Sequence, residues 1–102
     1  MPKRKLINTK ESKLTYPIVE VIWTDAAEYG EIGWNNLKDM LRESKKPCPT
    51  MNTVGYCVYY GDEHIALIST IGGDECSRLD KIPLAFVKDI IFLSGGTADL
   101  SE

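Results

Sequence analysis

Hydrophobic and polar residues alternate with a period of two along much of this chain, which is the spacing of β-strands whose two faces meet different surroundings. The alternation is clearest from Thr53 to Tyr60, and the β-branched run from Ile18 to Thr24 has one charge inside it. The pattern predicts five strands, at residues 18–24, 53–60, 64–71, 76–82 and 87–93, with tight turns at 61–63 and 72–75 and one turn of 3₁₀ helix at 83–86.

One segment between the first two strands has a helical period instead. Its repeating apolar residues are Trp34, Leu37, Met40 and Leu41. Charged residues occupy the positions between them, so the segment is amphipathic. Asn35 or Asn36 can cap its start, and the run from Lys45 to Pro47 ends it with favourable charge and a helix breaker. We therefore expect a helix over about residues 34–45.

The order of these elements is one strand, one helix and four more strands. We expect a mainly β, α+β domain: a small, highly curved, five-stranded antiparallel barrel with one amphipathic helix inserted after the first strand. Gly55 lies inside the second strand, where such a barrel needs a sharp bend. The domain is expected to span residues 16–94, between a flexible basic arm at residues 1–15 and a flexible tail at residues 95–102.

Composition and charge narrow the class of protein. A hydrophobic share of 43% and a charged share of 26% are those of a globular domain. No apolar run approaches the roughly 20 residues that span a bilayer, and no apolar segment follows the basic N-terminus, so neither a membrane span nor a signal peptide is expected. Three cysteines without a C-x-x-C pair fit a reducing compartment, which places the protein in the cytoplasm.

The net charge of −3 is unevenly distributed along the chain. Residues 1–14 carry +4 and the remainder carries −7. An acidic body disfavours broad binding to a phosphate backbone, which requires basic surface. Lys3, Arg4 and Lys5 keep a contact with nucleic acid or an acidic partner open, and the alternative is a basic terminus that serves only solubility.

The residues that usually carry catalysis or bind metals are sparse. His64 is the sole histidine, it stands beside Asp62 and Glu63, and no catalytic motif surrounds it. The acidic residues from Asp25 to Glu31 do not have the spacing of a calcium loop. Gly72 to Glu75 predicts a hairpin turn because paired glycines supply the positive φ of such turns. We expect no catalytic residue, no metal and no cofactor.

Aromatic residues supply the candidate binding site. Trp23 and Trp34 flank one loop, and strict alternation places Tyr59 on the face opposite Tyr56 and Tyr60. Exposed aromatics stack on bases or anchor a protein partner. The candidate ligand-binding residues are Trp23, Asp25, Trp34, Tyr59 and Arg78. Two alternatives stay open: both tryptophans pack the helix onto the barrel, and Arg78 pairs with nearby carboxylates.

Three stretches together resemble a known group of proteins. They are Trp23-Thr24-Asp25 with Gly33-Trp34, then Thr53-Val54-Gly55-Tyr56, then Ile82-Pro83 with Val87 to Leu93. Over residues 16–94 this arrangement is similar to small, mostly uncharacterised proteins of tailed phages and prophages. The run from Ile82 to Val87 also resembles the strand, 3₁₀ turn and strand that close Sm-like and SH3-like barrels. Sm-like proteins place their helix before the first strand, and this chain places it after.

The resemblance implies a function by binding. Phage accessory proteins of this kind often counter host defences. The implied protein is non-enzymatic, works in the cytoplasm of a bacterial host, and either sequesters a nucleotide-type signal molecule or blocks a host protein. Small barrels of this type assemble through open strand edges, so a homo-oligomer is expected. The alternatives are an Sm-like nucleic-acid-binding module and an enzyme with an unrecognised site.

Overall fold

The computed structural model describes residues 14–93, which form a mainly β fold with one α-helix. The basic arm up to residue 13 and the tail from residue 94 lie outside the described residues. The elements, in chain order, are β1 (Ile18–Thr24), α1 (Leu37–Ser44), β2 (Thr50–Tyr60), β3 (His64–Ile68), β4 (Ile71–Gly72), β5 (Glu75–Cys76), β6 (Leu79–Pro83), the 3₁₀ helix η1 (Leu84–Phe86) and β7 (Val87–Phe92).

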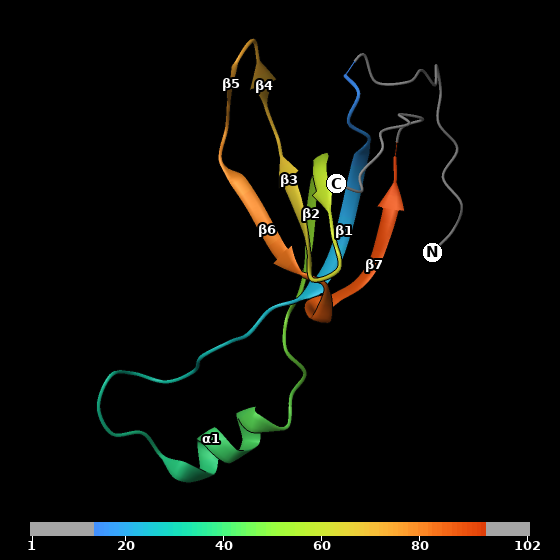
Figure 1. Ribbon diagram of the computed structural model, residues 1–102. Helices are drawn as coiled ribbons and strands as arrows, with labels where there is room; N and C mark the ends of the chain where they lie inside the picture. Colours follow the sequence, from blue (N-terminus) through green and yellow to red (C-terminus); the bar gives the residue numbers. More distant parts are fainter. Residues whose placement is uncertain (1–13, 94–102) are drawn as a thin grey trace.

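Five strands form one antiparallel sheet in the order β6-β3-β2-β1-β7 (Figure 1). The expected antiparallel sheet of five strands, with a helix after the first strand, is confirmed. Hydrogen bonding ends at β6 on one side and β7 on the other, so the sheet has two edges. The short β4–β5 ribbon extends from one end of the sheet, and the segment that carries α1 extends from the opposite end.

The core lies on one face of this sheet. Its fully buried side chains include Val19 and Val21 of β1, Cys57 of β2, and Ile65 and Leu67 of β3. Their spacing follows the alternation read from the sequence, because every second residue of a strand turns to the same face. Burial of such side chains is the main favourable contribution to folding, at roughly 25 cal/mol per Å² of apolar surface.

A bulge in β2 changes which tyrosines share a face. The paired residues are Tyr56 with Ile68, Cys57 with Leu67, Tyr59 with Ala66 and Tyr60 with Ile65. The register shift leaves Val58 as an extra residue on β2. Cross-strand partners share a face, so Tyr59 lies on the face of Tyr56, and Tyr60 lies on the other. The expectation from strict alternation was wrong, because one inserted residue reverses the face on which each later residue of the strand lies.

The strands after this hairpin are shorter than the sequence indicated. The strand expected at 64–71 ends at Ile68, and the strand expected at 76–82 becomes β5 and a separate β6. Hydroxyl groups interrupt the ladder here: the Ser77 Oγ accepts a hydrogen bond from the Thr70 amide at 3.0 Å and lies 3.0 Å from the Ser69 Oγ. Side chains that bond to nearby backbone groups compete with strand pairing, and the chain turns into the β4–β5 ribbon.

The helix begins three residues later than the pattern predicted. Asn36 is its N-cap, since its Oδ1 accepts a hydrogen bond from the Asp39 amide at 3.0 Å. Trp34, expected in the first turn, therefore belongs to the preceding loop. Within residues 14–93, no helix is long and apolar enough to cross a bilayer.

Candidate functional site

Residues 25–49 form a projection that leaves the sheet after β1 and returns at β2, with α1 at its far end (Figure 1). The two legs of the projection are joined at its base, where the Asp25 amide donates to the Pro49 carbonyl oxygen at 3.0 Å. This bond continues the β1–β2 ladder one step beyond the pair of Thr24 and Thr50. Beyond it the legs separate, and the helix stands away from the body of the sheet.

The loop before the helix holds its own shape through one side chain. The Asn35 Oδ1 accepts from the Glu31 amide, and the Asn35 Nδ2 donates to the Glu31 carbonyl, both at 2.9 Å. The same amide nitrogen lies 3.4 Å from the Gly33 carbonyl oxygen. Gly30 and Gly33 have φ values of 107° and 112°, in the region that favours glycine. The loop is thus a closed turn whose polar groups bond inward.

Five large apolar side chains of the projection are exposed. We call them the apolar set, and they are Tyr29, Ile32, Trp34, Leu37 and Leu41. Ile32 and Trp34 are fully exposed, and α1 buries none of its residues. The opposite arrangement, with apolar groups inward and polar groups outward, is what a loop in water normally adopts. Contiguous exposed apolar patches are typical of interaction surfaces.

The charged residues of α1 lie on its polar side. Arg42 pairs with Asp39, and the Lys46 Nζ lies 2.9 Å from the Glu43 Oε2. The pKa of Lys46 is raised by this hydrogen bond and by the charge of Glu43. These pairs are exposed and contribute little to stability.

The two tryptophans have different environments. Trp23 packs partly buried against the core, and its Nε1 donates to the Thr53 Oγ1 at 2.9 Å. Trp34 is fully exposed on the projection. The alternative in which both tryptophans pack the helix onto the sheet is therefore wrong. It failed because the amphipathic pattern says that a helix has an apolar face and does not say what covers that face.

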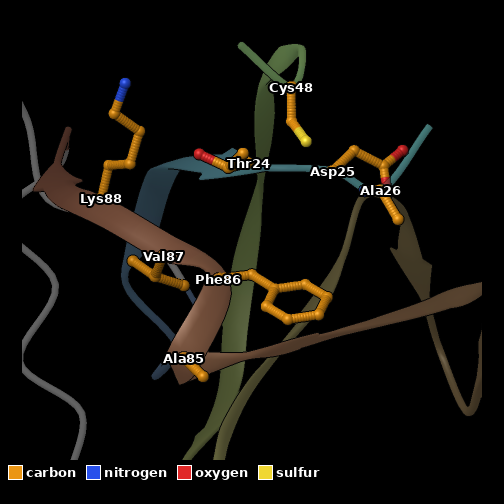
Figure 2. A pocket seen from close by; sticks show the side chains of 8 residues that line it. All are labelled: Thr24, Asp25, Ala26, Cys48, Ala85, Phe86, Val87 and Lys88. Atoms are coloured by element: carbon orange, nitrogen blue, oxygen red, sulfur yellow. The ribbon is translucent and has the colours of Figure 1, made fainter. Parts of the chain in front are cut away.

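A hollow of about 370 Å³ lies at the root of the projection, between its two legs and the chain around η1 (Figure 2). The Phe86 ring extends from η1 toward Asp25 and Ala26, while Lys88 extends from β7 away from the ring. The Cys48 side chain, from the returning leg, also lines the hollow. The space is open and largely apolar, with one carboxylate and one ammonium group among its lining residues.

The five candidate ligand-binding residues do not converge on one place. Asp25 lines the hollow at the root of the projection, and Trp34 lies out on the projection. Tyr59 lies in the β2–β3 hairpin, where its ring centroid is 5.0 Å from that of His64. Arg78 lies between β5 and β6 and forms no ion pair with any residue from 14 to 93, so the expected pairing with neighbouring carboxylates is absent there.

Two observations concern metal binding and the reactivity of a buried thiol. Across residues 14–93, no group of three His, Cys, Asp or Glu side chains is placed to hold a metal ion. Cys57 is buried, and burial raises the pKa of its thiol above the ordinary 9.0. A protonated, buried thiol is a weak nucleophile.

Sequence reasoning missed part of this surface. Ile32 was read as loop, and Phe86 as part of a turn, although both are large apolar residues in segments rich in glycine or proline. A large apolar residue in such a segment is the signal that could have identified them, because a loop has no periodic face that buries such side chains. Comparisons with protein-family models, with curated proteins and with solved structures find no match to this chain.

Proposed function

We propose that this protein is a non-enzymatic binding protein of the phage accessory type, and that it acts through protein contacts made by the projection. The observation that carries the proposal is the full exposure of Ile32 and Trp34 on a loop clamped by Asn35. Tryptophan is among the residues that contribute most to protein interfaces, because it buries a large rigid surface at small entropic cost.

The clamp matters for affinity as well as for position. A loop that is already ordered loses less conformational entropy on binding than a flexible one. Two glycines at positive φ, one hydrogen bond that Asn35 accepts and two that it donates order the loop before any partner arrives. The apolar set is thus held in place before binding. This favours contact with a protein surface of matching shape over a loop that rearranges around a small ligand.

The proposal also concerns the architecture of the sheet. The strand order β6-β3-β2-β1-β7, with η1 between the last two strands, is the order of a small SH3-like or Sm-like barrel. We infer that the sheet is an opened version of that barrel. Residues 14–93 carry 12 acidic and 7 basic side chains, a net charge of −5, which supports a protein partner over nucleic acid.

A second candidate is capture of a nucleotide-type molecule in the hollow at the root of the projection. Its volume of about 370 Å³ is within the range of ligand sites. The half-exposed Phe86 ring offers a stacking surface, Lys88 can reach a phosphate, and Asp25 can accept from an amine or hydroxyl group. Native mass spectrometry of protein purified from phage-infected bacteria tests it: extra mass of nucleotide size supports capture, and bare chains contradict it.

The protein-contact proposal is tested by photocrosslinking in bacteria that express the full chain. A benzophenone amino acid replaces Trp34, and in a control chain it replaces Leu79, which is half exposed on β6. We expect a covalent adduct with a protein from position 34 and a much weaker one from position 79. Equal labelling at the two positions, or no adduct from position 34, would show that the projection is not the contact surface.

A further inference from the structure

The apolar set of the projection is exposed in the single chain. The features of the projection favour one partner that would cover it. We propose that a second copy of this chain covers it, so that two projections pack against each other in a homodimer. This inference rests on the proposed function, because it names the partner of the same surface.

The area of the apolar set matches what a stable dimer requires. Its five side chains have exposed fractions between 53% and 107%. At about 150–250 Å² for a large, fully exposed side chain, they present on the order of 700 Å² together. A stable protein interface buries about 800 Å² on each partner. The summed exposed area of these side chains is therefore close to the area that one partner buries in a standard interface.

Helix α1 requires a permanent stabilising contact with another surface. With 8 residues it is shorter than the roughly 12–15 residues at which an isolated helix becomes marginally stable in water, and it buries none of its own residues. The Asn36 cap contributes only about 1 kcal/mol. A helix in this position must be held by a permanent contact and not by an occasional one. A second copy meets this requirement because it is present wherever the chain itself is present.

The first test is the mass of the purified full chain in solution, measured by light scattering and sedimentation over a range of concentrations. We expect twice the chain mass. Trp34→Ala and Leu41→Ala each raise the dissociation constant, Trp34→Ala by about 30-fold, which corresponds to a hot-spot residue. Leu79→Ala is the matched control, since Leu79 is 50% exposed on the sheet and Leu41 is 53% exposed on the projection.

Circular dichroism and thermal unfolding show whether each variant keeps the fold, and alanine retains the helix propensity of position 41. A monomeric wild-type chain at every concentration overturns the inference, as does a dimer that Leu79→Ala weakens as much as Leu41→Ala. The crosslink from position 34 separates the two proposals. An adduct of twice the chain mass supports the second copy, and an adduct of another mass overturns it while the protein-contact function stands.

Discussion

Gly55 gives the sharpest test of how the sheet is packed. A Cβ added there would lie 3.0 Å from the carbonyl oxygen of Ile68 and 3.3 Å from the Cβ of Leu67. These atoms belong to β3, which pairs with β2, and Leu67 is part of the buried core. A backbone oxygen in a paired strand cannot rotate away as the end of a flexible side chain can. Gly55→Ala must therefore push β2 and β3 apart.

The expected loss follows from the cost of overpacking. Forcing one extra carbon into a well-packed interior lowers the free energy of unfolding by about 1–3 kcal/mol. Alanine fits a strand somewhat better than glycine does, which returns roughly 0.5–1 kcal/mol. We therefore expect a net loss of about 1–2 kcal/mol. For a domain of this size that loss lowers the Tm by roughly 4–16 °C.

The assay is unfolding in urea followed by far-UV circular dichroism, with Gly72→Ala as the control. A Cβ at Gly72 would meet nothing within 4 Å, and Gly72 also lies in a strand, so this variant isolates the effect of crowding. The slope of free energy against urea should stay constant for both variants. A Gly55→Ala chain as stable as Gly72→Ala would refute the reasoning that β2 and β3 approach too closely for a side chain.

Three further outcomes are expected. Under native conditions a thiol reagent should modify exposed Cys48 and Cys76 but not buried Cys57, and all three should react after denaturation; rapid reaction of three thiols in the native protein would contradict the burial. Burial raises the pKa of Cys57 above 9.0, so the thiol of the unfolded chain ionises at a lower pH than that of the folded chain. The free energy of unfolding should therefore fall as the pH rises above about 9. Cys57→Ala should show a smaller fall, and an equal fall in both chains would assign the effect to other groups. Asn36→Ala removes the hydrogen bond to the Asp39 amide, so it should lower the helix content and reduce the free energy of unfolding by about 1 kcal/mol. Circular dichroism measures both quantities, with Asn52→Ala as the control. Equal effects of the two variants would show that the cap does not hold the helix.

Much of the fold was readable from the sequence because strand periodicity is a local property. Val19 and Val21 share one face of their strand, as the period of two predicts, and both are buried. The 3₁₀ turn after Pro83 and the hairpin after Tyr60 were also correct, since proline and glycine restrict or release the backbone at their own positions. Such features depend on a few consecutive residues.

The candidate site was only partly readable. The sequence singled out Trp34 as a residue for binding, and the structure places it on the exposed projection, although its role in binding stays a prediction. It also grouped Trp34 with Tyr59 and Arg78, which lie in other parts of the fold. Residue type points to the chemistry that a side chain can perform. It does not say which side chains meet, because that depends on how distant strands pair.

The sequence by itself determined the mainly β class, the helix after the first strand and the antiparallel sheet of five strands. Only the tertiary structure decided the register of β2, where one extra residue at Val58 turns Tyr59 to the face of Tyr56. It also decided that α1 stands away from the sheet with its apolar side uncovered. Both depend on partners far along the chain: a strand's register is set by the strand beside it, and an amphipathic helix packs against whatever surface the rest of the molecule leaves within its reach.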